Sequence, residues 1–519
     1  MRVGDGDVHG VPARARAREA VLFASVLVIA TCGISYELVA GALASYVLGD
    51  SVTQFSLVIG TYLFAMGIGS YLSQLVPGHR LCATFVAVEV LVGAIGGVSA
   101  AALFASFAYL GSLRPLLFGL TTVTGILVGL EIPLVLQVLR DRYGFKELIA
   151  RVLFLDYVGA LAASLLFPFV LMPALGLVRT SFVFGLANVG VAVFSTWLFR
   201  AELRRPGLLF AATALVLAGL GAGMVFADAI RGACEERLFE ATVVLAHDSR
   251  HQAIRVTDRR GDLRLYLNGT LQFSSRDEHR YHEALVHPAL SLHEAPRRVL
   301  VLGGGDGLAL REVLKHAPVE RVRLVDLDPA MTGTFASVQA LAALSGGALL
   351  SPRVAIANED AMAFLEETDE RFDVAIVDLP DPSNYSLGKL YTVTFYRLLA
   401  RRLEPGGLLV TQATSPSLAP RSFSCIVNTV RSAGFAVRPY HAHVPSFGDW
   451  GFVLAGASLG PAGPPIRLRE GLGLRFLDDA TAASLFRFPA DMPLLDTPAN
   501  RLDDQILVHY HNDEWARWE

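Results

Sequence analysis

Residues Val299 to Asp328 read VLVLGGGDGLALREVLKHAPVERVRLVDLD, and this stretch decides the fold of the C-terminal half. An apolar run of strand type is followed by three glycines and by a helical pattern with Leu310, Val313 and Leu314 on one face. A second apolar run then ends in acids, the first of which is Asp326. A carboxylate at that position suits a ribose diol, because it accepts hydrogen bonds from both hydroxyls. The stretch therefore predicts a strand–loop–helix–strand unit that binds a nucleoside or dinucleotide at the glycine loop.

The composition divides the 519-residue chain into two unlike halves. Hydrophobic residues make up 53% and charged residues 18% of the chain, and the mean hydropathy is +0.46. Up to about Ala227 nearly every residue is apolar, whereas the remainder has the charge density of an ordinary globular enzyme. The net charge of -4 gives no reason to expect a nucleic-acid partner. The four scattered cysteines lack metal-type or redox-type spacing, and we predict no metal.

The N-terminal half predicts a polytopic α-helical membrane domain over residues 20–229, preceded by a basic tail over residues 1–19. It contains about seven apolar segments, each near the roughly 20 residues that cross a bilayer. Their approximate limits are 20–47, 56–76, 83–109, 115–138, 152–176, 179–199 and 207–228. A lipid bilayer is therefore an expected partner.

Four acids lie within these segments, namely Glu37, Glu89, Glu131 and Asp156. An ionisable group in hydrocarbon is unfavourable, so such residues usually face the interior of the bundle or a cavity. One interpretation is a path for a cation, a polyamine or protons. The other is hydrogen bonding between helices, or hydration near a membrane face. The sequence leaves both open.

Basic residues gather on one side of the predicted membrane domain. They are the N-terminal arginines and Arg140, Arg142, Lys146, Arg151, Arg200, Arg204 and Arg205. The positive-inside rule therefore places the N-terminus in the cytoplasm. An odd number of spans would then carry the C-terminal half outside, away from any cytosolic nucleotide. Either one span is miscounted or re-entrant, or the C-terminal half faces outward.

The C-terminal half predicts a small antiparallel β unit and a leading helix over residues 235–290. A Rossmann-like α/β domain of the methyltransferase type follows over residues 291–460. The β unit rests on two strand-like segments separated by turn signals, Ala253–Thr257 and Leu263–Leu267, and the helix on Asp277–Leu290. The strands of a doubly wound, mostly parallel sheet are expected at Val299–Leu302, Val322–Val325, Val354–Ala357, Val374–Val377 and Leu408–Gln412. Residues 461–519 form an extension to which the sequence assigns no function.

Acids follow the first four of these strands in succession, as Asp306, Asp326, Asp360 and Asp378. Ligands of open α/β sheets bind at the carboxyl ends of the strands. A single aspartate there means little, but four in succession beside a glycine loop indicate a nucleoside site with a cationic substrate nearby.

Six stretches between about His251 and Phe452 resemble the aminopropyltransferases, of which spermidine synthase is the main example. They are His251-Gln252, LYLNGTLQFSSRDEHRYHE, LGGGDGLALREVLKH, the strand end at Asp326, Glu359-Asp360-Ala361, and DVAIVDLPDPSNYSLGKLYTVTFY. The membrane half is similar to the spans fused to spermidine synthase-like domains in some bacteria. The resemblance thus implies a multi-pass protein of the bacterial inner-membrane type.

The resemblance implies a reaction and a set of partners. The family transfers a 3-aminopropyl group from decarboxylated S-adenosylmethionine to an amine, putrescine by default, leaving methylthioadenosine. With putrescine the other product is spermidine. Soluble relatives form dimers or tetramers, so a homodimer or homotetramer is implied.

The resemblance also assigns cofactor-binding positions residue by residue. Asp326 takes the ribose position, Asp360 and Ala361 take the adenine position, and Tyr385 stands where many members have a proline near the nucleoside. The remaining expected cofactor contacts are Gln252, Gln272, Gly303, Gly304, Gly305 and Asp306.

On the amine side, Tyr281, His282, Asp378 and Asp381 match substrate-binding positions. An aliphatic amine with a pKa near 10 must lose a proton before it attacks, and Asp378 is placed to act as the catalytic base. Asp381 and Asp306 can hold the other ammonium groups. Asp381 could instead begin a turn before Pro382, and His282 could be an ordinary helix histidine.

Two alternatives stay open. A methyltransferase would use intact S-adenosylmethionine, but its carboxylate would be repelled by Asp306. A membrane polyamine transporter or sensor would bind without turnover.

Two departures from the family lie on the amine side. The catalytic loop reads Asp-Leu-Pro-Asp-Pro, and Phe447 stands where many members have a tyrosine. The donor is therefore better determined than the acceptor.

Overall fold

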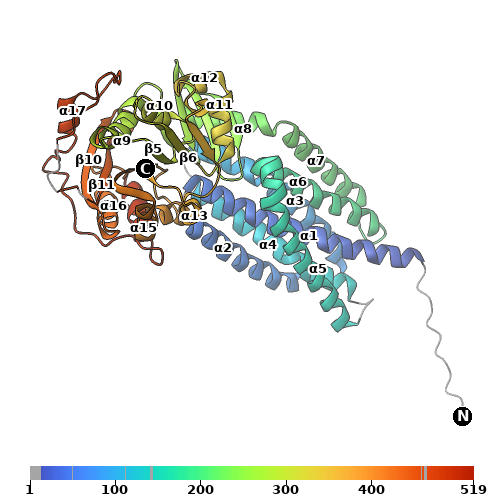
Figure 1. Ribbon diagram of the computed structural model, residues 1–519. Coiled ribbons are helices and arrows are strands. Elements are labelled where there is room, and N and C mark those ends of the chain that lie inside the picture. The colour runs from blue at the N-terminus through green and yellow to red at the C-terminus, as the bar shows by residue number, and fades with distance from the viewer. Residues whose placement is uncertain are drawn as a thin grey trace, which may run out of the picture. The chain divides into compact units, whose positions relative to one another are not determined.

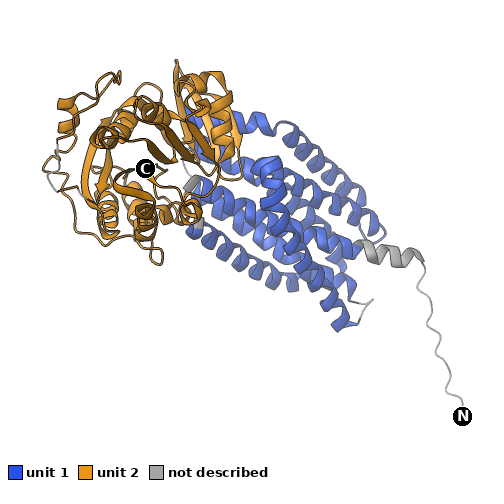
Figure 2. Ribbon diagram, in the orientation of Figure 1, with its two compact units in different colours: residues 1–241 blue, residues 242–519 orange. Residues whose placement is uncertain are grey.

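The computed structural model describes residues 13–48, 51–110, 113–140, 144–457, 459–460 and 465–518. It divides into two compact units, residues 1–241 and 242–519 (Figure 2). The part of the predicted basic tail before residue 13 lies outside the described residues, as does Arg142.

The first unit is a bundle of seven long apolar helices, α1 to α7 among the described residues, and ends with the short, charged helix α8 (Figure 1). Its helices are α1 Ala13–Leu48, α2 Ser51–Leu72, α3 Leu81–Leu110, α4 Arg114–Leu139, α5 Phe145–Leu166, α6 Met172–Leu198, α7 Pro206–Val225 and α8 Ala227–Phe239. Within the described residues, six helical stretches are long and apolar enough to cross a membrane. The predicted class, a polytopic helical domain at the N-terminus, is confirmed in this sense.

The count of six differs from the predicted seven because one stretch, Lys146–Leu198, runs through two predicted segments. It contains α5, a short π-helical segment Phe167–Leu171, and α6. As a straight helix its 53 residues would extend about 80 Å, well beyond a hydrocarbon core of roughly 30 Å. Gly176 interrupts the helix with a φ of 69°, a conformation that glycine adopts readily. Two passes in this stretch, and hence seven in the bundle, stay a prediction.

The acids of the bundle have different surroundings. Glu89 in α3 is fully buried and accepts a hydrogen bond of 3.1 Å from Asn188 Nδ2 of α6, which supports the interhelical interpretation for this residue. Glu131 and Asp156 instead line a cavity of about 60 Å³ together with Tyr62. For Glu37, Glu131 and Asp156, the choice between a path for cations or protons and a role in helix packing therefore stays open.

The second unit begins with a four-stranded antiparallel meander of strand order β1-β2-β3-β4. Its strands are β1 Thr242–Asp248, β2 Ala253–Arg259, β3 Asp262–Leu267 and β4 Thr270–Ser274. Helix α9, Glu278–Leu292, follows at the predicted place. The small antiparallel unit ahead of the α/β domain is therefore confirmed, although only its two middle strands were recognised from the sequence.

The main sheet has seven strands in the order β10-β11-β9-β8-β5-β6-β7. Its strands are β5 Arg298–Gly303, β6 Arg321–Val325, β7 Val354–Ala357, β8 Phe372–Asp378, β9 Leu403–Gln412, β10 Ala436–Val444 and β11 Gly448–Gly456. Strands β5 to β9 pair in parallel, as predicted. Strands β10 and β11 form an antiparallel hairpin, and β11 pairs with β9. β5 and β8 are almost continuous apolar runs because parallel strands are covered on both faces.

Helices cover both faces of this sheet and enclose one apolar core on each (Figure 1). They include α10 Leu308–Leu314, α11 Pro329–Ser337, α12 Gln339–Leu344, α13 Ala361–Glu367, α14 Tyr385–Gly388, α15 Val393–Arg402 and α16 Pro420–Ser432. The extension adds α17 Asp479–Ser484 and α18 Ile506–Trp515. The doubly wound architecture is confirmed, and it places β5 inside the sheet, between β8 and β6.

Candidate active site

The strand order brings the predicted acids to one edge of the sheet. Because β5 lies between β8 and β6, the glycine loop that follows it is flanked by the carboxyl ends of both neighbours. Asp378 ends β8, and Asp326 follows β6 directly. The glycine loop therefore lies between Asp326, on the predicted nucleoside side of the site, and Asp378, on the predicted amine side.

Gly304 and Gly305 are needed in this loop because the carboxylates of Asp378 and Asp326 lie too close to leave room for a side chain. Gly304 has a φ of 66°, and a Cβ built on it would lie 3.0 Å from Asp378 Oδ2. On the other side, a Cβ on Gly305 would lie 2.6 Å from Asp326 Oδ2. The backbone N–H of Gly304 donates to the carbonyl oxygen of Asp378 at 3.0 Å, and that of Gly305 donates to Asp326 Oδ2 at 3.0 Å. Side chains at these positions would displace both acids.

The carboxylate of Asp326, the predicted ribose-binding acid, is held by two backbone hydrogen bonds. Besides Gly305, the N–H of Asp328 donates to its Oδ1 at 2.9 Å. Burial raises the pKa of Asp326 to about 6, although these two backbone hydrogen bonds oppose the shift. Gln252 reaches the same corner, where its Nε2 donates to Asp328 Oδ2 at 3.2 Å. Gln272 instead donates to the carbonyl oxygen of Thr270 at 3.1 Å, so its expected cofactor contact stays a prediction.

The predicted adenine position has a second function in the fold. Asp360 Oδ1 accepts hydrogen bonds from the backbone N–H groups of Met362 and Ala363 and thereby caps α13. Its Oδ2 pairs with Lys389 Nζ at 2.5 Å. Burial opposes ionisation of Asp360, but Lys389 and the cap hydrogen bonds outweigh it and lower the pKa. Ala361 is the first residue of α13, which keeps its backbone beside this acid.

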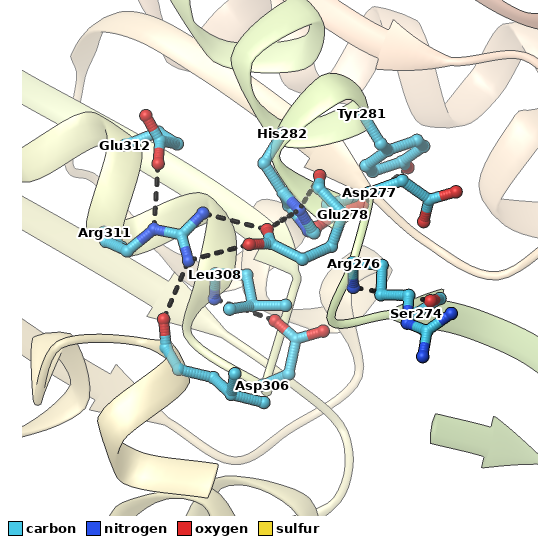
Figure 3. Close-up of polar contacts among 12 residues, drawn as sticks. Ser274, Arg276, Asp277, Glu278, Tyr281, His282, Asp306, Leu308, Arg311 and Glu312 are labelled. Carbon is cyan, nitrogen blue, oxygen red and sulfur yellow. Dashed lines mark hydrogen bonds and ion pairs between the residues drawn. The ribbon is translucent and has the colours of Figure 1, made fainter. Parts of the chain in front are cut away.

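A largely buried ionic network connects α9 with α10, the helix that follows the glycine loop (Figure 3). Arg311 from α10 forms two hydrogen bonds to Glu278, at 3.0 Å and 2.8 Å, and His282 Nδ1 lies 3.0 Å from Glu278 Oε2. Burial opposes ionisation of Glu278, but His282 and Arg311 outweigh it and lower the pKa to about 2. Burial likewise opposes charging of His282, but Glu278 outweighs it and raises the pKa to about 9. One ring nitrogen of His282 is thus used within its own helix, and its amine contact stays a prediction.

Asp306 and Asp378 interact electrostatically with the charge of His282. Asp306 Oδ1 accepts a hydrogen bond of 2.9 Å from the N–H of Leu308. Burial raises the pKa of Asp306 to about 6, against the attraction of the His282 charge. Burial also raises the pKa of Asp378, which the charge of His282 and a 2.7 Å hydrogen bond from Tyr281 Oη oppose. Asp306 can therefore exchange a proton near pH 6.

Asp381, the second acid of the predicted catalytic loop, is held by residues that the sequence did not single out. Gln412 Nε2 lies 3.2 Å from Asp381 Oδ1, and Thr414 Oγ1 donates to Oδ2 at 2.9 Å. His511 from α18 places its Nε2 3.2 Å from the same Oδ2. Gln412 could have been found from its position at the carboxyl end of a predicted strand. Nothing in the local sequence connects His511 to this loop.

The site carries an excess of negative charge. Five carboxylates, those of Glu278, Asp306, Asp326, Asp378 and Asp381, stand against two cations, His282 and Arg311. Such a site attracts ligands that carry several positive charges.

Comparison with known proteins agrees with this geometry. Residues 278–460 match the Spermine/spermidine synthase domain. Polyamine aminopropyltransferase 2 of Ralstonia nicotianae is 53% identical over 502 residues, covering 96% of this chain and 98% of the relative. The polyamine aminopropyltransferase of Leptospira interrogans is 48% identical and covers 96% of this chain and 99% of the relative.

Among solved structures, a spermidine synthase in complex with the transition-state analogue AdoDATO is similar at 26% identity, with a TM-score of 0.45. That match covers 48% of this chain and 85% of the other. The decisive comparison is the one with the full-length relatives, which extends through both units of this chain. The chain belongs to the polyamine aminopropyltransferase family.

Proposed function

We propose that this chain transfers the 3-aminopropyl group of decarboxylated S-adenosylmethionine to putrescine, giving spermidine and methylthioadenosine. The observation that carries the proposal is Asp306, a buried carboxylate inside the cofactor loop beside Asp378. Decarboxylated S-adenosylmethionine ends in an ammonium group, which a carboxylate attracts. Intact S-adenosylmethionine adds a carboxylate, which Asp306 would repel, and this disfavours a methyltransferase.

In the proposed reaction an amine nitrogen of putrescine attacks the carbon beside the sulfonium. The C–N bond forms while the C–S bond breaks, and the bonding pair leaves on sulfur as the neutral thioether of methylthioadenosine. The attacking amine must first give up a proton, and Asp378 receives it as the general base. Tyr281 occupies Oδ1 of Asp378 and leaves Oδ2, which lies against Gly304, for the amine.

The remaining charges are matched by position. Asp326 would accept hydrogen bonds from the ribose hydroxyls, and Asp306 would pair with the ammonium of the aminopropyl arm. Asp381 would hold the far ammonium of the diamine. Because all three are carboxylates in a largely buried site, each pairing is a charge-assisted hydrogen bond of roughly 1.5–3 kcal/mol.

The test is an acceptor panel with purified full-length protein and decarboxylated S-adenosylmethionine. Mass spectrometry would identify the aminopropylated product, and chromatography would quantify methylthioadenosine. Spermidine and methylthioadenosine formed in equal amounts would support the proposal. Binding of putrescine without turnover would instead indicate a sensor or transporter, and methylated products from intact S-adenosylmethionine would indicate a methyltransferase.

We further propose that the apolar helices anchor the enzyme in the bacterial cytoplasmic membrane as a multi-pass protein. Six stretches of sufficient length and hydropathy support this. Reporter fusions at residues 76, 112 and 228 would give the number of passes and the side of the C-terminal unit. Cross-linking in detergent would test the homodimer or homotetramer that soluble relatives suggest.

A further inference from the structure

We propose that the C-terminal extension forms part of the acceptor side of the active site, with His511 as a positioning residue for Asp381. The inference rests on the proposed function and deepens it, because it assigns a role to residues outside the matched domain. That domain ends at residue 460, and α18 begins at Ile506.

Helix α18 is fixed to the catalytic domain at its C-terminal end. Glu514 is almost fully buried and accepts backbone hydrogen bonds from Arg421 at 2.9 Å and Ser422 at 3.0 Å. The hydroxyl of Ser422 donates to the same carboxylate at 2.7 Å. Glu514 therefore satisfies the free N–H groups in the first turn of α16, where a negative charge is favoured. This contact fixes both the position and the rotation of α18.

A second anchor connects the extension to the segment after the catalytic loop. Asn500 is fully buried, and its Nδ2 donates to the carbonyl oxygens of Gly388 at 3.0 Å and Tyr391 at 3.1 Å. The hydroxyl oxygen of Tyr391 in turn lies 3.2 Å from the carbonyl oxygen of Leu379 and 3.0 Å from that of Pro380, and these two acceptors share its single hydrogen. Through Tyr391, Asn500 thus supports the loop that carries Asp381.

Between these anchors, His511 is directed at Asp381. Its exposed fraction is 7%, and its Nε2 lies 3.2 Å from Asp381 Oδ2. The ring of Trp515, one turn further along α18, lies 5.9 Å from the imidazole ring. The ring centroids of Trp450 and Trp515 are 6.4 Å apart. Trp450 Nε1 donates a hydrogen bond of 3.2 Å to Gln412 Oε1. The extension and the strand that bears Gln412 therefore hold Asp381 from two directions.

The donors around Asp381 limit what else it can bind. A carboxylate offers about four acceptor positions. Gln412, Thr414 and His511 occupy three of them, one on Oδ1 and two on Oδ2. About one position remains, on Oδ1, and a terminal ammonium of the acceptor fits it. Thr414 is itself held in a left-handed conformation with a φ of 55°, which is rare for a β-branched residue and shows how firmly this cluster is fixed.

The role of His511 predicts that its loss affects the acceptor and not the cofactor. Without the Nε2 contact, the Asp381 carboxylate can rotate away from the far ammonium. We expect His511→Ala to raise the KM for putrescine about 10-fold, as the loss of one charge-assisted hydrogen bond implies. The KM for decarboxylated S-adenosylmethionine should stay within about twofold of wild type. His511→Gln keeps a side-chain N–H donor and should recover most of the loss, because the effect depends on the hydrogen bond.

The control is Asp513→Asn, on the exposed side of the same helix. It should leave both KM values and the melting temperature unchanged. Equal KM values for His511→Ala and wild type, or a parallel rise in both KM values, would overturn the inference.

Titration calorimetry with putrescine, in the presence of methylthioadenosine, gives the same comparison without turnover. A wild-type protein that fails to transfer the aminopropyl group would refute the proposed reaction. In that case the 10-fold loss of putrescine affinity in His511→Ala would still support the positioning role, and an unchanged affinity would refute it.

Discussion

The hydroxyl of Tyr281 donates a 2.7 Å hydrogen bond to Oδ1 of Asp378 and so assigns different roles to the two carboxylate oxygens. Oδ1 is bound to the protein, whereas Oδ2 faces the glycine loop at Gly304. This asymmetry leaves Oδ2 as the oxygen with which the proposed base would receive the proton of the acceptor. It also stabilises the ionised carboxylate, because burial alone would raise its pKa further.

Replacing Asp378 with asparagine should remove the proton acceptor while keeping the shape of the side chain. We expect kcat to fall by roughly 10²–10⁴, the usual contribution of a general base, with little change in methylthioadenosine affinity. Steady-state kinetics and calorimetry would measure the two effects. Asp369→Asn, at a fully exposed side chain, is the matched control. Turnover of Asp378→Asn close to wild type would show that another group accepts the proton.

Asp306→Asn should change the choice of cofactor. The variant loses the attraction for the ammonium of decarboxylated S-adenosylmethionine, and its affinity for that cofactor should fall about 10- to 100-fold. Affinity for intact S-adenosylmethionine should stay constant or rise, since the repulsion between carboxylates is removed. Methylthioadenosine has no ammonium, and its affinity should not change. An equal loss for all three ligands in calorimetry would contradict the charge argument.

The pKa values of Asp306 and Asp326 predict how cofactor binding depends on pH. Both are raised to about 6, so both acids are ionised at pH 8 and protonated progressively as the pH falls through 6. If both must be ionised, the logarithm of the affinity for decarboxylated S-adenosylmethionine should fall with a slope approaching two below pH 6. In Asp306→Asn the slope should approach one. A flat profile between pH 5 and pH 8 would contradict the assignment.

Gly304→Ala tests the close approach between the loop and the base. The new Cβ would lie 3.0 Å from Asp378 Oδ2, on a residue with a φ of 66°. We expect kcat to fall about 100-fold, as a displacement of about 1 Å at a reacting group can cause. Gly333→Ala in α11 is the control, because nothing lies within 4 Å of its added Cβ and the backbone is helical. That change should stabilise the fold by about 0.5–1 kcal/mol and leave kcat unchanged.

The sequence predicted those parts of the structure that are determined by residues close together in the chain. Hydropathy located the long helices, and the continuous motif around Gly303–Gly305 located the central strands with their acids. The hairpin β10–β11 was missed, because its segments show neither a clear period nor a motif. His511 was also missed, since its contact with Asp381 joins residues 130 positions apart. Contacts of that kind depend on how a distant helix docks, which no local pattern encodes.

The two halves of the site differ in the length of chain that must close to form them, and this predicts an order of folding. The contact between Gly305 and Asp326 spans 21 residues, and that between Asp381 and His511 spans 130. The entropic difference in loop closure is about 1.6 kcal/mol, from 1.5RT multiplied by the logarithm of the ratio. The nucleoside half is therefore expected to form early during folding, and the acceptor half last. Pulse-labelling hydrogen exchange should show protection at β5 and β6 before protection at α18.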